Sequence, residues 1–568
     1  MASIVGKKQG ARTYYYLVES ARVGGKPRIV SQRYLGSAEE VAARLSEAGP
    51  GEPDRSRHLA FGDVAATWAM LLRLGVAEVV DEVVGQRRSD AGASVGTYIA
   101  LAALNRVCDP CSKLAFSDWW AKTAGDRFVR VATSALDHRR FWDAMDMISE
   151  DQLQEIERLL VARLLERFGI DLSGLVLDMT NFATWIDSSN DRASIAQRGH
   201  SKQKRADLRL VGLGLVVSVD GGVPLLSHAY AGNLPDVTQF PLMVKELATR
   251  FERLAEDADV EAPTLTLVFD AGQNSEDNFE LLDTLPVHFV GSLPPSDHAD
   301  LLTVPLAEYR AVTKQRFPGL VAYETKKVVF GACRRVVLTH SETLHDKQSR
   351  GFDQTLAKAR RQLVEVAQRL SGGKTRKAKD KVEAEIAAIV RPRWVSRVIS
   401  TTLSGEAPAE LRLRHYTKPK ARAELEDEVF GKRILVTDKG KDVASTARIV
   451  ADYRSQEVAE GDFRQMKDPT VVSFSPMFHF TDQKIRVHVF YCVVALMIAR
   501  LMTREADRSG LHMSVRELLD TLSGIEETVL LYHGERGRPR ARRMLTEVDP
   551  IQQRLYELFG LEAYAPKR

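Results

Sequence analysis

The spacing of hydrophobic and polar positions changes several times along this 568-residue chain. Residues 12–36 are rich in aromatic and β-branched residues and predict a β-hairpin, with Gly24 and Gly25 at its turn. Between residues 61 and 172 the apolar positions follow a helical period instead. We therefore predict a small β-hairpin module over residues 1–60 and a helical domain over residues 61–172.

Short apolar runs separated by turns and helices follow over residues 173–300. Their order is three strands, a helix near residues 236–254, a strand, a second helix and a further strand. This order suits an α/β fold with an RNase H-like mixed sheet. The run ILVTDK, after residue 430, predicts that the chain returns to the same core over residues 431–505.

The predicted insertion, residues 301–430, begins with a β-like run and continues with a helical stripe. Its apolar residues alternate at spacings of four and three, which is a heptad pattern: Phe352, Leu356, Ala359, Leu363, Val366 and Leu370. Residues 371–373 break the stripe, and Val382, Ile386 and Ile389 resume it. An antiparallel helical hairpin within the insertion is the simplest interpretation, and pairing between two chains is the alternative. Residues 506–568 are predicted to form a helical, basic tail.

Three carboxylates have contexts that would direct them to one site. Asp178 ends the apolar run GLVLDMTNF, Asp270 ends TLTLVFDAG, and Glu460 lies on a helix predicted over residues 449–467. The two aspartates belong to the first and fourth core strands, which we expect to be neighbours. Mg²⁺ prefers a few carboxylate oxygens and keeps positions open for water and phosphate. The three acids therefore predict a site for two Mg²⁺ ions, with Mn²⁺ as a substitute, for phosphodiester chemistry. Taken singly, each acid could instead cap a strand or face water.

At about 100° per residue, Tyr453, Gln456, Glu460 and Lys467 fall within roughly 60° of one another on the predicted helix. This frame resembles the Tyr-Arg-Glu-Lys signature of DDE insertion-sequence transposases. Gln456 stands where that signature has Arg, and it offers a neutral amide in place of a guanidinium fork. The spacing selects Glu460 over its neighbour Glu457.

The resemblance extends over about residues 174–502, through the segments RGHSKQKRADLRLVGLGLVV, AGNLPDVTQF and PMFHFTDQKIRVHVFYCVVAL. It is similar to the elongated branch of these transposases, whose RNase H-like catalytic domain carries a large insertion. The resemblance implies cleavage at the ends of an insertion sequence and joining of the 3′-hydroxyl ends to target DNA by two-metal-ion phosphoryl transfer. It also implies double-stranded partners, namely terminal inverted repeats and target DNA, a homodimer on DNA, and recognition of the ends by residues 61–172.

The formal net charge is only +4, so affinity for DNA must come from local basic patches. The candidate DNA-binding residues lie between the first two core strands and on the Glu460 helix: Lys202, Lys204, Arg205, Tyr453, Gln456, Arg464 and Lys467. The run Arg536–Pro539 resembles a hook for the minor groove, and a basic surface turn is the alternative.

Four cysteines in so long a chain indicate a reducing compartment, and the first residues contain no apolar core of a secretory signal. We expect a cytoplasmic protein that joins the nucleoid when bound to DNA. The apolar stretch 487–502 is shorter than a bilayer span and predicts a buried core helix, so no membrane partner is expected. Two other functions fit the same residues: an RNase H-like nuclease without strand transfer, and a catalytically silent DNA-binding protein derived from a transposase.

Overall fold

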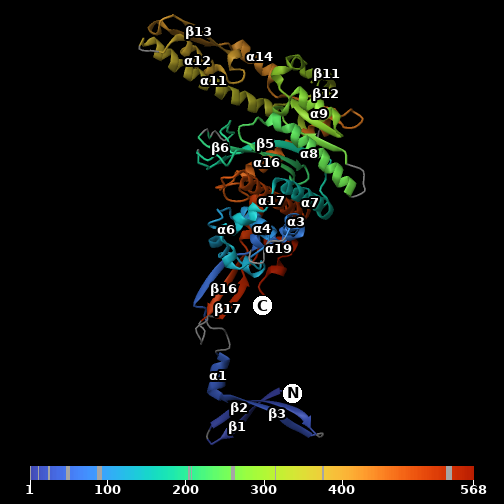
Figure 1. The fold of residues 1–568 in the computed structure, drawn as a ribbon, viewed down its shortest axis with the longest axis vertical. Coiled ribbons are helices and arrows are strands. Elements are labelled where there is room, and N and C mark those ends of the chain that lie inside the picture. Colours follow the sequence, from blue (N-terminus) through green and yellow to red (C-terminus); the bar gives the residue numbers. More distant parts are fainter. Residues whose placement is uncertain are drawn as a thin grey trace. The chain divides into compact units, whose positions relative to one another are not determined.

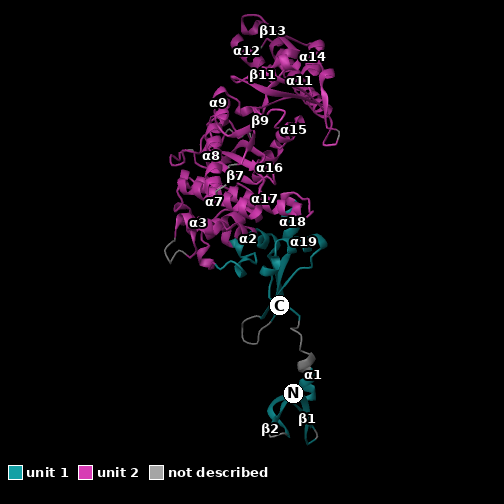
Figure 2. Ribbon diagram, turned by 90° about the vertical axis from the view of Figure 1, so that its right-hand side faces the viewer, with its two compact units in different colours: residues 1–69, 118–130, 517–568 teal, residues 70–117, 131–516 magenta. Residues whose placement is uncertain are grey.

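The computed structural model describes residues 2–10, 12–23, 26–46, 52–85, 92–187, 189–202, 205, 207–257, 263–313, 315–373, 377–532 and 540–567. The chain divides into two compact units (Figure 2). The first comprises residues 1–69, 118–130 and 517–568, and the second comprises residues 70–117 and 131–516. All three candidate carboxylates belong to the second unit. The domain boundaries drawn from the sequence stay predictions.

The first unit contains two small antiparallel sheets. The elements are β1 (Ala2–Gln9), β2 (Arg12–Val23), β3 (Lys26–Ser37), α1 (Ala38–Ser46), β4 (Arg55–Ala60), β16 (Glu526–Tyr532), β17 (Arg540–Leu545) and α19 (Pro550–Leu558). The predicted hairpin is present as β2 and β3, its turn glycines lie outside the described residues, and β1 pairs along β2. In the second sheet β16 pairs with both β4 and β17. The tail is therefore not purely helical, because β16 finds its partner strand near the start of the chain.

The described part of residues 61–172 is largely helical, as the sequence pattern predicts. The helices are α2 (Gly62–Leu74), α3 (Val76–Val84), α4 (Val95–Cys108), α5 (Phe116–Trp120), α6 (His138–Asp146) and α7 (Glu150–Phe168). Within the second unit α4, α6 and α7 pack against α17 (Asp482–Arg508). Among the described helices α17 alone is long and apolar enough to cross a membrane, and 89% of its apolar window is buried inside the protein. A core helix has these properties, since burial within protein also favours apolar residues.

The second unit is built on a mixed sheet of nine strands in the order β10-β11-β12-β15-β9-β8-β5-β6-β7. Strands β5, β6, β11 and β12 of this sheet are labelled in Figure 1. The strands are β5 (Leu175–Thr184), β6 (Arg209–Ser218), β7 (Pro224–Ala231), β8 (Leu265–Val268), β9 (Val287–Leu293), β10 (Arg310–Thr313), β11 (Phe317–Val329), β12 (Ala332–Ser341) and β15 (Lys432–Thr437). Strands β5, β6 and β7 pair with one another in antiparallel fashion, whereas β8 lies parallel to both β5 and β9. Helices α8 (Asp236–Asp257) and α9 (Glu276–Thr284) connect β7 to β8 and β8 to β9. The fold is therefore mixed α/β, as expected.

The chain segment 301–430 contributes more to this sheet than the sequence pattern predicts. The expected β-like run lies in a hairpin of β11 and β12, and β12 also pairs with β15, which itself pairs with β9. Val336, Val337 and Leu338 on β12 are fully buried. Because both faces of this strand are covered, it extends the main sheet and does not form a separate β-module.

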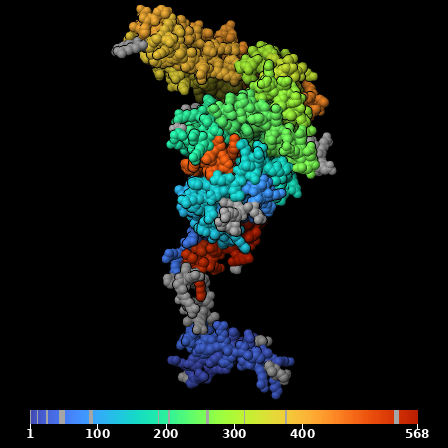
Figure 3. Space-filling model, in the orientation of Figure 1, coloured from blue at the N-terminus to red at the C-terminus, as the bar shows by residue number. Residues whose placement is uncertain are grey.

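The helices predicted in the same segment are α11 (Glu342–Ser371) and α12 (Lys379–Val390), which lie side by side (Figure 1). They are followed by α13 (Val395–Val398), β13 (Ile399–Ser404), β14 (Arg412–Thr417) and α14 (Pro419–Val429). The six residues of the heptad pattern are the six buried residues of α11. The seam is thus filled inside one chain. In Figure 3 the yellow surface of this region adjoins the green surface of the segment that precedes it in the chain.

We predict that Leu363→Ala loosens the α11–α12 pair, because Leu363 is completely buried and its truncation leaves a cavity. The expected cost is about 2–4 kcal/mol. Hydrogen exchange of the α11 amides, measured in the full-length variant and the wild-type protein, should be faster in the variant because the helix opens more often. The matched control is Val364→Ala on the next position, which is 41% exposed and should change exchange little. Equal exchange in the two variants would contradict the assigned seam.

Candidate functional site

The register of two parallel strands places Asp178 and Asp270 at the same level of the sheet. Val176 on β5 pairs with Val268 on β8, and each aspartate stands two residues beyond this pair. Asp270 follows the end of β8, as predicted. Asp178 does not end its strand, because β5 stays paired with β6 as far as Thr184. It is instead a half-buried carboxylate within a strand, beside the point where β8 stops.

The third acid comes from a helix that packs on this part of the sheet. The helix predicted over residues 449–467 is two helices, α15 (Thr446–Arg454) and α16 (Gln456–Met466). They separate at Ser455, whose hydroxyl donates to the carbonyl oxygen of Asp452. Such a local hydrogen bond competes with the helical ladder and interrupts it. Glu460 is an exposed residue of α16, which packs against β5 and β6 (Figure 1).

Two contacts fix α16 in place. At its end Lys467 Nζ donates to Thr180 Oγ1 at 2.7 Å, and Thr180 shares a face of β5 with Asp178. On the other side the fully buried Asp462 pairs with Arg500 on α17. Burial raises the pKa of Asp462 to about 7, and Arg500 opposes this rise. Because the two contacts lie on different sides of α16, they set the rotation of the helix that carries Glu460.

The three carboxylates influence one another electrostatically. Burial raises the pKa of Asp178 to about 6, and the negative charges of Asp270 and Glu460 raise it as well. The Met179 N–H and Lys202 oppose this rise. Burial likewise raises the pKa of Tyr453, to which Asp270 and Glu460 also contribute. Asp178, Asp270 and Glu460 therefore share one neighbourhood.

No Lys, Arg or His within the described ranges forms an ion pair with Asp178, Asp270 or Glu460. The Asp178 carboxylate accepts the N–H of Met179 at 2.7 Å, and Asp270 accepts that of Ala271 at 2.7 Å and the Ser292 hydroxyl at 3.3 Å. As placed, no three His, Cys, Asp or Glu side chains of the described chain are close enough together to hold a metal ion. The donor set nevertheless fits Mg²⁺, because it consists of carboxylate oxygens whose negative charge is not neutralised. The metal-binding role stays a prediction.

Lys202 is held at the edge of this neighbourhood by contacts that the sequence does not reveal. Its ammonium donates to the carbonyl oxygen of Met179 at 2.5 Å and to Asp236 at 2.8 Å. Tyr230 donates to the same carboxylate at 2.6 Å. Asp236 is the first residue of α8 and lies within the segment AGNLPDVTQF. An acid at the start of a predicted helix was the one sequence feature that pointed to Asp236 as a partner for a cation.

The other candidate DNA-binding residues differ in their exposure. Arg464 is exposed on α16, and Gln456 is half-buried at the start of the same helix. Tyr453 lies on α15 with 8% of its surface exposed, and Arg433 lies over its ring at 5.6 Å. Its ring therefore packs inside the protein, at the edge of the acidic neighbourhood.

Arg205 lies over the ring of the exposed Trp185, at 5.2 Å, and pairs with Asp207. Trp185 directly follows β5, so this pair stands near the far end of the strand that carries Asp178. Lys204 lies outside the described residues, and so does the run Arg536–Pro539. DNA contact by all of these residues stays a prediction.

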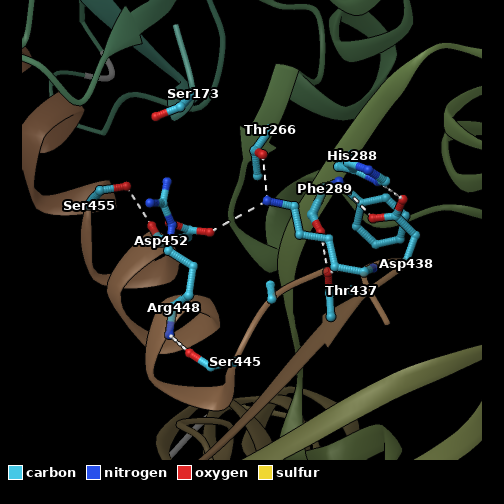
Figure 4. Close-up of polar contacts among 12 residues, drawn as sticks. Ser173, Thr266, His288, Phe289, Thr437, Asp438, Ser445, Arg448, Asp452 and Ser455 are labelled. Atoms are coloured by element: carbon cyan, nitrogen blue, oxygen red, sulfur yellow. Dashed lines mark hydrogen bonds and ion pairs between the residues drawn. The ribbon is translucent and has the colours of Figure 1, made fainter. Parts of the chain in front are cut away.

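A buried polar network attaches α15 to the sheet (Figure 4). Lys439 follows β15 and donates to Thr266 on β8 at 2.6 Å, and it lies 3.8 Å from Asp452 on α15. Arg448 pairs with the same carboxylate at 2.7 Å. Thr437 donates to the Phe289 carbonyl oxygen at 2.6 Å. The network therefore connects the start of the glutamate-bearing segment to strands β8, β9 and β15.

We predict that Asp178→Asn stabilises the protein when no divalent cation is present. The carboxyl group has a raised pKa in the folded protein, so its contribution to stability is present below pH 3.8 and is lost as the pH rises through about 6. At neutral pH the buried charge is therefore unfavourable, and removing it should gain about 1–3 kcal/mol. Thermal unfolding at about pH 7.5 and about pH 4 measures the effect, which should be present only at the higher pH.

The control for this substitution is Asp143→Asn, because Asp143 is an exposed acid on α6. It should leave the unfolding temperature unchanged at both pH values. An Asp178→Asn variant that is less stable than the wild-type protein at neutral pH would contradict the assigned burial of charge.

Comparisons with known proteins give only distant structural likenesses. A scan against protein-family models finds no match, and a search of curated proteins also finds none. Six solved chains match, among them a piggyBac transposase in a synaptic complex with hairpin DNA. The TM-score is 0.37 at 9% identity, over 80% of this chain and 78% of that one. A TM-score this low supports no conclusion about function, so we base the function on the side chains of the site.

Proposed function

We propose that this protein is a DDE transposase, which cleaves DNA at the ends of an insertion sequence and joins the 3′-hydroxyl ends to target DNA. One observation carries the proposal. Asp178 and Asp270 stand at one level of two parallel strands, and the charge of Glu460, from a helix packed on β5, reaches Asp178. Distant parts of the sequence thus bring three acids into one neighbourhood, and carboxylate oxygens are the donors that phosphodiester chemistry with Mg²⁺ would use.

The arrangement of the core strands supports an RNase H-like catalytic domain. The order β7-β6-β5-β8-β9 has an antiparallel half and a parallel half that meet at β5 and β8. The acids lie at this junction, where ligand sites of open sheets are commonly found. The long segment between β9 and β15 supports the branch of the family with a large insertion.

Two bound Mg²⁺ ions would stabilise the attacking and leaving oxygens of an in-line displacement. Asp178, Asp270 and Glu460 would hold them and would form no covalent bond to DNA. Water is the nucleophile for cleavage, and a DNA 3′-oxygen takes its place for joining. Lys467, which donates to Thr180, and the exposed Arg464 would contact phosphates near the acids. We also infer that the protein acts as a homodimer on DNA, because transposition brings two DNA ends together. We infer separately that it is cytoplasmic.

We predict that Asp178→Ala, Asp270→Ala and Glu460→Ala each lower cleavage by more than about 100-fold, because each removes a metal ligand. The measurement uses the full-length protein, DNA carrying the terminal repeats of its element, and Mg²⁺ or Mn²⁺. The three variants should keep the circular dichroism spectrum of the wild-type protein and should still bind the terminal repeats. The matched control is Glu457→Ala, which removes an exposed acid from the first turn of the same helix and should leave cleavage intact. If one of the three variants cleaves DNA at the wild-type rate, the replaced residue is not a metal ligand.

The products of the same reaction separate the proposed function from its alternatives. A transposase yields the element's ends joined to a target plasmid. A nuclease without strand transfer yields cut ends only, since the geometry of the acids does not distinguish water from a DNA hydroxyl as the nucleophile. Binding of the repeats without cleavage under any divalent cation would identify a silent DNA-binding protein, and Gln456 in place of Arg is the feature that favours this outcome.

Cleavage should also depend on pH through Asp178. Burial and its acidic neighbours raise the pKa of this carboxyl group to about 6, and only the deprotonated form binds a cation. At a limiting concentration of Mn²⁺ we expect cleavage to fall as the pH is lowered from about 7.5 through about 6. More Mn²⁺ should move the fall to lower pH, because the cation competes with the proton. A pH profile that does not respond to the Mn²⁺ concentration would contradict this assignment.

A further inference from the structure

The second unit contains a cavity that the proposed catalytic site does not use. Its volume is about 280 Å³. It is lined by the end of α4, the segment after it, α6 and the chain that leads into α17: Arg106, Ser112, Lys113, Leu114, His138, Trp142, Pro476, Phe478, His479 and Tyr491. This volume is close to the lower end of the range for small-molecule sites, roughly 300–1,000 Å³.

Two basic side chains line this cavity, and each has a buried nitrogen without a hydrogen-bond partner. Lys113 is buried, its Nζ has no hydrogen-bond partner, and it lies 4.3 Å from the centre of the Tyr491 ring. Arg106 is 1% exposed and donates through Nη1 and Nη2 to the carbonyl oxygens of Cys111, Ser475 and Pro476. Its Nε has no partner.

None of the residues found to line the cavity is acidic. Burial, together with the charge of Arg106, lowers the pKa of Lys113 to about 7. A buried donor without a partner costs free energy, and a buried cation without an anion costs more. A simple packing defect would be lined by apolar groups and would carry no such cost. An anion that reached these two nitrogens would offset this cost.

The mouth of the cavity is aromatic and apolar. Trp142 is 37% exposed, Phe478 is 59% exposed and Leu114 is 71% exposed. The ring of His138 packs edge-on against Trp142, with 4.8 Å between the ring centres, and so holds the indole in one orientation. Burial and the nearby cations lower the pKa of His479 to about 3, so this ring is a neutral polar group. A planar ring entering the mouth can stack on such exposed aromatic faces.

We propose that this cavity binds a mononucleotide unit, with its phosphate at Lys113 and Arg106 and its base against Trp142. The combination of a cationic interior and an aromatic mouth matches an anion joined to a planar ring, and the volume admits one such unit. The proposal does not rest on the three carboxylates. A free nucleotide and an unpaired nucleotide within DNA present the same chemistry, and experiment separates them.

Isothermal titration calorimetry of the full-length protein tests this site with 5′-AMP, 5′-TMP, inorganic phosphate and adenosine. We expect at least one nucleotide to bind at least about tenfold more tightly than phosphate or adenosine, because only the nucleotide fills both parts of the cavity. Lys113→Met should weaken nucleotide binding at least about tenfold and leave the fold intact, since it replaces a buried unpaired ammonium by an apolar chain of similar length. Trp142→Ala should weaken nucleotide binding but not phosphate binding.

Two exposed residues of the insertion provide matched controls. Lys358→Met and Tyr416→Ala remove a lysine and an aromatic ring far along the sequence from the cavity and should leave nucleotide binding unchanged. A single-stranded pentanucleotide that competes with the free nucleotide would identify the unit as part of DNA, and failure to compete would identify a free nucleotide. The proposal is overturned if neither nucleotide binds, or if Lys113→Met and Trp142→Ala both bind nucleotide as the wild-type protein does.

Discussion

The candidate site depends on the parallel pairing of β5 with β8. This pairing sets Asp178 and Asp270 at one level, although 270 − 178 = 92 positions separate them in the sequence. Strand β8 stops after Val268 whereas β5 continues, so the sheet has a step, and both aspartates lie beside it. Helix α16 then covers β5, and the Lys467–Thr180 contact fixes its end on the strand that carries Asp178. A shift in the register of these strands would separate the acids.

The same sheet accommodates the long insertion without disturbing the pairing of the core strands. The segment between β9 and β15 leaves the core and returns beside it, because Thr437 on β15 pairs with Val290 on β9. Strands β10, β11 and β12 continue the sheet outward, and α11 buries its heptad residues within the insertion, where it packs on β14 and α12. Lys439, immediately after β15, then connects β8 to α15 through Thr266 and Asp452. The insertion is thereby attached at the edge of the core, and the glutamate-bearing helices start from an anchored position.

The sequence predicts those features that depend on local patterns. The succession of strands and helices along residues 173–300, the helix that begins at Asp236 and the buried positions of α11 follow from apolar periodicity. Features set by distant partners were missed. Strand β5 passes Asp178 because β6 pairs along its whole length, and β16 forms because β4 lies beside it. The break at Ser455 depends on one hydroxyl contact, and the pairing of Lys202 with Asp236 depends on how a loop meets α8. The spacing of residues does not encode such contacts.

The most direct test of the central claim is Mn²⁺ binding to the free protein, measured by electron paramagnetic resonance. If Asp178, Asp270 and Glu460 share a site, then Asp178→Asn, Asp270→Asn and Glu460→Gln should each weaken Mn²⁺ binding, by more than about tenfold. The double variant Asp178→Asn/Glu460→Gln should weaken it by less than the sum of the two separate free-energy changes, because residues of one site are coupled. Wild-type Mn²⁺ affinity in all three single variants would contradict a shared metal site.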